Sequence, residues 1–246
     1  WQLLTGGERQ AFQKLSVFQG AFDRHAAETV SGVSPDGLRS LLDKSMLQAA
    51  PGSCRMHDIL RQYAAEKLAA AEPLASQVRE AHAVYYLERL AGYESRLRSA
   101  ERSKTLHAMD AEINDLQAAW KWACHQANIP LLGGGLSGLC MYYEMRVRYQ
   151  EGEQACQAGL AALPAVAEQQ SAAGILSARL LLWRANFLTL AGELEAARNL
   201  RQQAGELLDL LEAQGLDTRR PRAMYWQAEG EAQVELKSKL GCYQRG

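Results

Sequence analysis

The chain has 246 residues, with 27 Lys and Arg against 28 Asp and Glu, so its formal net charge is −1. This balance excludes a global electrostatic attraction to nucleic acid or to an anionic membrane. The length allows one or two domains with a real core. The composition is rich in Ala, Leu, Gln, Glu and Arg and poor in Val, Ile and Thr, which favours helix over sheet.

The five cysteines are scattered, odd in number and never in C-x-x-C spacing (Cys54, Cys124, Cys140, Cys156 and Cys242). A reduced, cytoplasmic compartment is the simpler interpretation. No signal peptide or membrane-spanning run is recognisable. The chain begins with Trp1 rather than Met, and we expect it to be an excerpt of a longer protein.

The N-terminal part predicts three short helices. Apolar residues at helical spacing predict an amphipathic helix over residues 8–18. Asp23 is a capping residue for a second helix over residues 23–30. Ser34 and Pro35 begin a third helix, because Ser caps a helix well and Pro suits its first position.

A β-hairpin and a fourth helix follow. Residues 46–50 and 53–57 flank the turn-forming dipeptide Pro51-Gly52. Asp58 is a good N-cap for a helix over residues 59–68, which carry one apolar stripe. Three helices, a hairpin and a fourth helix form the pattern of a winged helix.

These elements predict a mainly α protein in which a winged helix is followed by an α-superhelical array. The predicted domains are a winged helix (1–70), connecting helices (71–128) and tetratricopeptide-like helical repeats (129–246, incomplete at the C-terminus), with no strand after Pro73. Helices are expected over residues 78–90, 111–123, 130–149, 153–163, 178–190, 196–211 and 222–236.

The repeat assignment depends on helix pairs with a glycine turn, such as Gly192, between them. Leu139–Leu163 and Leu180–Leu211 align loosely in this phase. A repeat array buries each apolar face against the next repeat. We therefore expect Trp226 to be partly uncovered and residues 237–246 to form a frayed end.

Four blocks carry a family resemblance. They are Leu15-Ser16-Val17-Phe18-Gln19-Gly20-Ala21-Phe22, Leu41-Leu42-Asp43-Lys44-Ser45-Met46-Leu47, the run from Arg55 to Leu68 that contains Met56-His57-Asp58, and Ala111-Glu112-Ile113-Asn114-Asp115-Leu116-Gln117-Ala118-Ala119-Trp120. In this order they resemble the bacterial STAND/NB-ARC-type signal-transduction ATPases of the transcriptional-regulator type. Met56-His57-Asp58 is the literal M-H-D motif of that family.

The resemblance implies a nucleotide-sensing role for His57. In the family this histidine reaches the β-phosphate of ADP, and Met56 and Asp58 would support it. An imidazole N–H can donate to a phosphate oxygen. The alternative is a histidine that merely finishes the hairpin.

The phosphate cradle itself is absent, because the sequence has no G-x-x-x-x-G-K-[ST]. The glycine-rich run over residues 133–138 lacks the lysine and the preceding strand, and it is more typical of close helix packing. This chain is therefore expected to hold no cofactor and to catalyse nothing. The resemblance implies that the intact parent binds ADP or ATP and hydrolyses ATP through another domain.

Direct DNA binding by the winged helix is not favoured. Residues 1–70 carry eight Lys and Arg and seven Asp and Glu, whereas a duplex binder normally presents a basic face. The helix at the recognition position offers Arg39 and Lys44 but also Asp36 and Asp43.

Other sites are not indicated. Cys124 and His125 are adjacent and cannot face one metal from a helix, and His25, His82 and His107 are isolated in sequence. The basic run Arg219-Arg220-Pro221-Arg222 is typical of a solvated loop.

The sequence thus predicts the regulatory part of an ATPase switch. Its partners would be the nucleotide-binding domain of the same parent chain and an unknown effector or protein on the repeats. A DNA-binding winged-helix regulator and a nucleotide-independent interaction scaffold stay open as alternatives.

Overall fold

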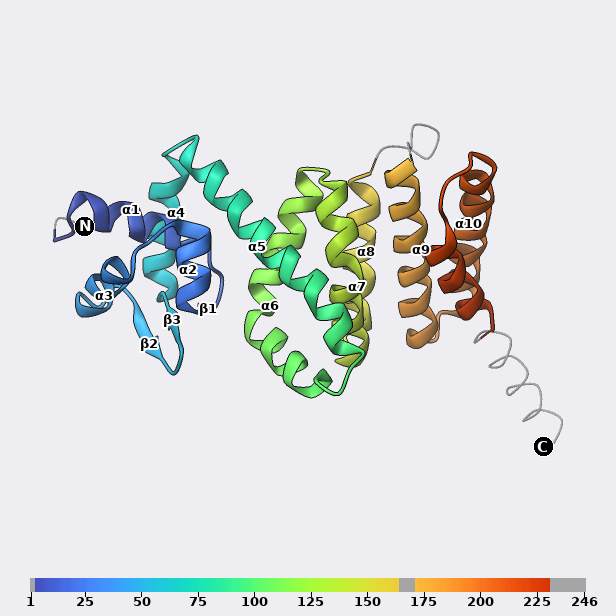
Figure 1. The fold of residues 1–246 in the computed structure, drawn as a ribbon, viewed down its shortest axis with the longest axis horizontal. Coiled ribbons are helices and arrows are strands. Elements are labelled where there is room, and N and C mark those ends of the chain that lie inside the picture. The colour runs from blue at the N-terminus through green and yellow to red at the C-terminus, as the bar shows by residue number, and fades with distance from the viewer. Residues whose placement is uncertain (1–2, 164–170, 231–246) are drawn as a thin grey trace. The chain divides into compact units, whose positions relative to one another are not determined.

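The structure is a computed structural model that describes residues 3–163 and 171–230 (Figure 1). Within these ranges the protein is mainly helical and has one small antiparallel sheet, so the predicted fold class is confirmed. The chain divides into two compact units, Trp1–Ala123 and Cys124–Gly246. The predicted domain boundaries near residues 70 and 128 stay predictions.

The first unit begins with a winged-helix-like arrangement. Its elements are α1 (Gly6–Leu15), β1 (Ala21–Phe22), α2 (Arg24–Ser31), α3 (Pro35–Asp43), β2 (Gln48–Ala50), β3 (Ser53–Arg55) and α4 (Asp58–Ala69). The strands form an antiparallel sheet in the order β1-β3-β2. The predicted hairpin is present but shorter than expected, and β1 was not predicted because a two-residue strand shows no alternation. In the register, Cys54 lies opposite both Phe22 and Ala49.

Side-chain caps set the helix starts. Asp23 and Ser34 accept from the N–H groups of Ala26 and Gly37, as predicted. The expected 8–18 helix instead begins at Gly6, because Thr5 and Glu8 form a reciprocal capping box.

Glu8 also ties α1 to α3. Lys44 Nζ lies 2.7 Å from both carboxylate oxygens of Glu8, and Ser40 Oγ donates to the same carboxylate. Lys44 first and Ser40 second lower the pKa of Glu8 to about 2, so this carboxylate stays ionised well below neutral pH.

Two long helices complete the first unit, α5 (Leu74–Leu97) and α6 (Arg102–His125, whose last two residues belong to the second unit). The helix α2 packs on α5, and the buried Phe18 ring stacks on Phe22 with centroids 4.3 Å apart. Between α5 and α6, Arg89 pairs with Glu112 at 2.5 Å, and the Tyr93 hydroxyl donates to the same carboxylate at 2.9 Å.

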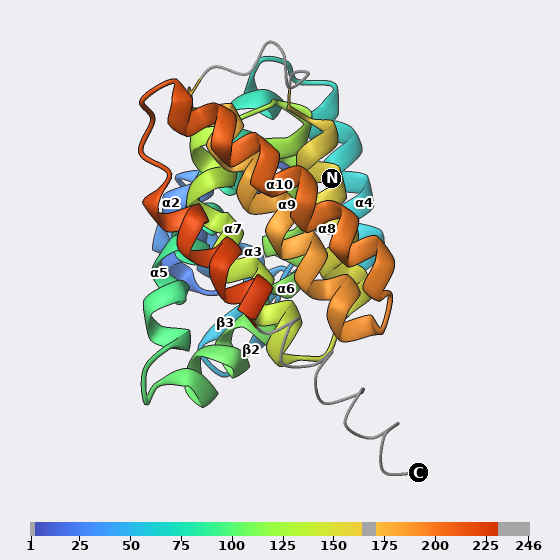
Figure 2. The ribbon, with the colours of Figure 1, turned by 90° about the vertical axis from the view of Figure 1, so that its right-hand side faces the viewer.

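The second unit consists of antiparallel helix pairs. They are α7 (Ile129–Met145) with α8 (Tyr149–Ala161) and α9 (Ser171–Ala191) with α10 (Leu194–Ala213), followed by helical residues 219–230. Helix α9 lies between α8 and α10 (Figures 1 and 2). Gly192 makes the turn of the second pair at φ +88°, which only glycine adopts at little cost. No strand occurs among the described residues after Pro73.

The second unit contains the glycine-rich run, Trp226 and the basic run that the sequence analysis described. The glycine-rich run lies inside α7, with Gly135 and Gly138 buried. Trp226 is 64% exposed, as expected, whereas residues 237–246 lie outside the described residues. The basic run is helical rather than a loop. Within it Arg222 pairs with Asp209 at 2.6 Å and with Glu212 at 2.8 Å, whereas the Arg219 side chain is 90% exposed.

No helix among the described residues is long and apolar enough to cross a membrane. The four described cysteines carry free thiols, and the buried Sγ atoms of Cys140 on α7 and Cys156 on α8 lie 3.6 Å apart.

The contact between α8 and α9 depends on the absence of a side chain at Gly152. A Cβ atom there would lie 2.4–2.7 Å from three atoms of the Phe187 ring, which is fully buried. We expect Gly152→Ala to lower the free energy of unfolding by about 1–3 kcal/mol, the usual cost of overpacking. Gly92→Ala is the matched control, because Gly92 lies within α5 and its added Cβ meets nothing within 4 Å. The control should gain roughly 0.5–1 kcal/mol from helix propensity. Urea unfolding followed by circular dichroism compares the two, and equal gains in stability would contradict the packing.

Candidate functional site

His57 lies at the junction between β3 and α4. It is the N-cap of α4, and its exposed ring accepts through Nδ1 from the Ile59 N–H at 3.4 Å. A ring nitrogen that accepts carries no proton. In this geometry a neutral imidazole therefore carries its proton on Nε2, the nitrogen that can donate outward.

The two residues beside His57 in the sequence differ in burial. Met56 is 3% exposed and anchors the junction in the core, whereas Asp58 is exposed. The prediction that Asp58 caps α4 is wrong: His57 takes the cap, and Asp58 is the first helical residue, 3.9 Å from Arg61 Nε. At that position the positive end of the helix dipole still stabilises the Asp58 carboxylate.

Arg61 connects this junction to the turn that follows α1. Its Nη1 donates to Gln19 Oε1 at 3.1 Å. The backbone N–H groups of Gln19 and Gly20 then donate to Asp115 on α6, at 2.7 and 3.1 Å. His82 on α5 places Nε2 2.8 Å from Oδ1 of the same carboxylate, which is fully buried.

This network joins three of the four blocks that carry the family resemblance. Arg61 belongs to the run after Met56, Gln19 and Gly20 belong to the first block, and Asp115 belongs to the last. These three blocks lie far apart in sequence but are joined by one hydrogen-bond network.

A cavity of about 240 Å³ adjoins the network. It is lined by Ser16, Val17, Gln19, Arg61, Ala65, Leu68, Arg79, His82, Ala118 and Trp122. Trp122, near the end of the helix predicted for residues 111–123, forms part of this wall. The Nε atom of Arg61 is buried there and has no hydrogen-bond partner.

Comparisons with known proteins leave the family open. No family model matches the chain, and no curated protein matches it. A solved structure, that of a signal-transduction ATPase with numerous domains (STAND) and a tetratricopeptide repeat sensor from Pyrococcus horikoshii, aligns with 94% of this chain at 14% identity and a TM-score of 0.43. The chain covers 35% of that protein's length. A likeness of this size does not establish a shared fold.

The recognition-position helix α3 offers little for DNA. Arg39 is exposed, but Lys44 is engaged by Glu8 and also donates to the Leu3 carbonyl at 3.2 Å. In the described part of the chain, no group of three or more His, Cys, Asp or Glu side chains is arranged to hold a metal.

The sequence reasoning missed Asp115 and treated His82 as isolated. The available signal was an acidic residue beside Leu116 on a buried helix, since a buried carboxylate needs donors. Its partners could not be identified, because Gln19 and Gly20 lie 96 and 95 residues away in the chain.

Removal of the Asp115 carboxylate should destabilise the first unit. Asp115→Ala leaves up to three buried or partly buried donors without their acceptor, and a buried donor without an acceptor costs about 1–3 kcal/mol. We therefore expect a loss of roughly 2–4 kcal/mol in the free energy of unfolding, measured by urea denaturation. Asn114→Ala, an exposed neighbour on α6, should change stability by no more than about 0.5 kcal/mol. Equal effects of the two substitutions would contradict the central position of Asp115.

Proposed function

We propose that this chain is the regulatory and sensor portion of a multidomain ATPase switch that controls transcription. The winged helix would sense the nucleotide state of a separate NTPase domain through His57, and the helical repeats would bind an effector or a protein partner. ADP or ATP would be held by the NTPase domain, which would also hydrolyse ATP. This chain would act in the cytoplasm and catalyse nothing itself.

The observation that carries the proposal is the position of His57. Its ring is exposed, its Nδ1 is engaged by the helix that it caps, and its Nε2 can donate to an anion. The positive end of the α4 dipole adds to this preference for negative charge. The phosphate contact itself is implied by the family resemblance and not by the geometry of this chain.

The hydrogen-bond network supports a route from the sensor to the helices that follow. A contact at His57 would restrain the first turn of α4, which also carries Arg61. Arg61 holds Gln19, and Gln19 is held by Asp115 on α6. A ligand shifts a two-state equilibrium only through its different affinities for the two states. In the proposed switch, ADP favours the closed state and the effector favours the open one.

We do not propose a DNA-binding role. Besides Arg39, the helix at the recognition position offers Lys44, and Lys44 is paired with Glu8. A nucleotide-independent scaffold is the remaining alternative, and the coding DNA distinguishes it. The frame upstream of Trp1 should encode G-x-x-x-x-G-K-[ST] after a strand, beginning within about 150–350 residues, one to two domain lengths. A start codon just before Trp1 would contradict the nucleotide role of His57.

Substitution of His57 in the protein that carries this NTPase domain tests the role directly. We expect His57→Ala to lose ADP faster and to raise basal activity, because one donor to the phosphate is removed. ADP dissociation and basal transcriptional output are the measurements. His107→Ala is the control, since His107 is also exposed and lies on α6. Unchanged ADP retention and unchanged basal activity in the His57 variant would exclude the proposed contact.

A further inference from the structure

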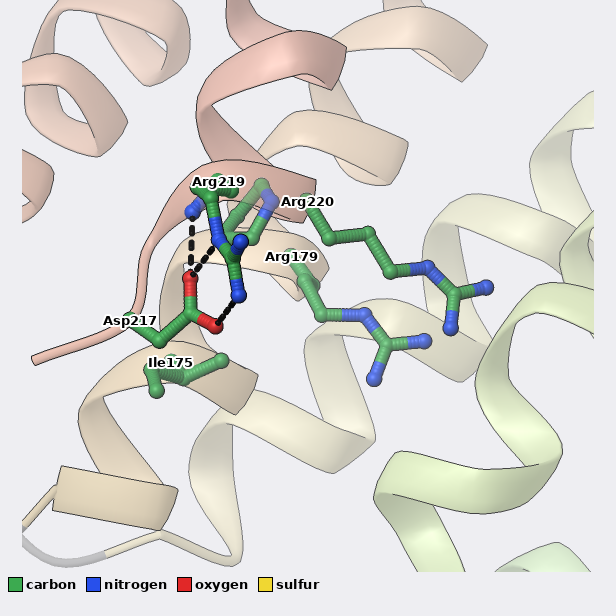
Figure 3. A pocket seen from close by; sticks show the side chains of 6 residues that line it. Ile175, Arg179, Asp217, Arg219 and Arg220 are labelled. Carbon is green, nitrogen blue, oxygen red and sulfur yellow. Dashed lines mark hydrogen bonds and ion pairs between the residues drawn. The ribbon is translucent and has the colours of Figure 1, made fainter.

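The cavity of about 240 Å³ in the first unit has cationic side chains in its lining but no carboxylate. The cations are Arg61 on α4 and Arg79 on α5. A cavity of about 440 Å³ in the second unit differs, because Asp217 lines it and pairs there with Arg219 at 2.6 Å (Figure 3). The cavity of the first unit is therefore the better candidate for an anionic ligand.

The two arginines of this lining each have a carboxylate nearby but no hydrogen bond to it. Asp58 Oδ1 lies 3.9 Å from Arg61 Nε, and Glu72 Oε1 lies 3.7 Å from Arg79 Nη1. Both distances exceed that of a hydrogen bond, and both carboxylate side chains are more than half exposed. Because exposed ion pairs of this kind contribute little, the oxygen atoms of a ligand can compete for either guanidinium.

Arg61 carries a buried donor that the protein does not satisfy. Its Nη1 donates to Gln19 Oε1 at 3.1 Å, which restrains the guanidinium, whereas its Nε is buried and has no hydrogen-bond partner. A buried N–H group without an acceptor is costly, so an anion that accepts from Arg61 would relieve this cost. A guanidinium that is already restrained also loses little conformational freedom when it binds.

The rest of the lining offers apolar surface for an organic group. Val17, Ala65, Leu68 and Ala118 contribute aliphatic atoms, and the half-buried Trp122 contributes an aromatic ring. Aromatic rings pair well in offset-stacked or edge-to-face arrangements. Pockets for drug-sized molecules usually measure about 300–1,000 Å³, so this smaller cavity suits a ligand with a single ring.

From these observations we infer that the cavity binds a small aromatic carboxylate. The planar donor fork of arginine matches the two oxygen atoms of a carboxylate, and Trp122 and Leu68 would pack on the ring. A single negative charge suits two cations that each have a distant carboxylate nearby. The inference goes beyond the proposed function, which places an effector on the helical repeats and a phosphate at His57, and it depends on neither.

Such a ligand would contact three helices of the first unit at once. Arg61 lies on α4, Arg79 on α5 and Trp122 on α6. A ligand that binds the native arrangement stabilises it by mass action. Occupation of the cavity should therefore restrain α4, the helix that His57 caps.

Isothermal titration calorimetry with the whole chain tests the inference. The probes are benzoate, benzamide and acetate. We expect saturable binding of benzoate. Benzamide should bind at least about tenfold more weakly because it lacks the charge, and acetate at least about tenfold more weakly because it lacks the ring.

Two substitutions locate the binding site. Arg61→Gln should weaken benzoate binding at least about tenfold, because it removes a charged donor. Circular dichroism verifies the fold of this variant, since Arg61 also donates to Gln19. Arg79→Gln removes the second guanidinium from an exposed side chain outside that network. It should weaken binding about threefold or more and decides the question if Arg61→Gln does not fold.

Arg98→Gln is the matched control. Arg98 is an exposed arginine at the C-terminal end of α5 that pairs with Glu94 at 3.7 Å, as Arg79 does with Glu72, and it does not line the cavity. Its substitution should leave the affinity unchanged. The inference is overturned if benzoate does not bind, if benzamide or acetate binds as tightly, or if no folded variant at Arg61 or Arg79 binds benzoate more weakly than Arg98→Gln does. No nucleotide is used, so this result is independent of the His57 test.

Discussion

A single buried carboxylate fixes the geometry of the first unit. Asp115 on α6 accepts hydrogen bonds from the backbone of Gln19 and Gly20 and lies within hydrogen-bond distance of His82 on α5. A buried carboxylate is tolerated only when donors surround it, so the turn after α1 has little freedom. Strand β1 begins at the next residue, pairs with β3, and β3 ends two residues before His57. The position of His57 therefore depends on Asp115, a buried residue of α6.

Two routes connect that carboxylate with the M-H-D motif. One runs through the backbone of the small sheet, and the other runs through the side chains of Gln19 and Arg61. Both end at the first turn of α4, which His57 caps through Nδ1. A displacement at this turn would disturb both routes together. This shared end point gives a physical basis for communication between a nucleotide contact and the long helices, which is what the proposed switch requires.

The sequence predicted features whose partners lie within a few residues of one another. The caps at Asp23 and Ser34 and the hairpin around Pro51-Gly52 are of this kind, and the structure confirms them. The prediction was one residue off at Asp58, because a histidine side chain can also accept a capping bond. It missed the role of Asp115, whose hydrogen-bond partners come together only after the helices pack. Long-range contacts of this kind leave no periodic pattern in the sequence. The role proposed for His57 would likewise depend on a phosphate held by a separate domain.

The hydrogen bonds of Arg179 affect the stability of one contact in the helical array. A stack of repeats behaves almost as a one-dimensional system, in which stability is a sum of repeat terms and nearest-neighbour terms. The bonds from Arg179 to Gly133 and Ser137 belong to one such neighbour term, between α7 and α9. Loss of these bonds would soften a single joint and leave the packing of α9 on α10 intact, since that contact is made by apolar side chains such as Leu208 and Leu211. The α7–α9 contact can therefore be weakened without disturbing the packing of α9 on α10.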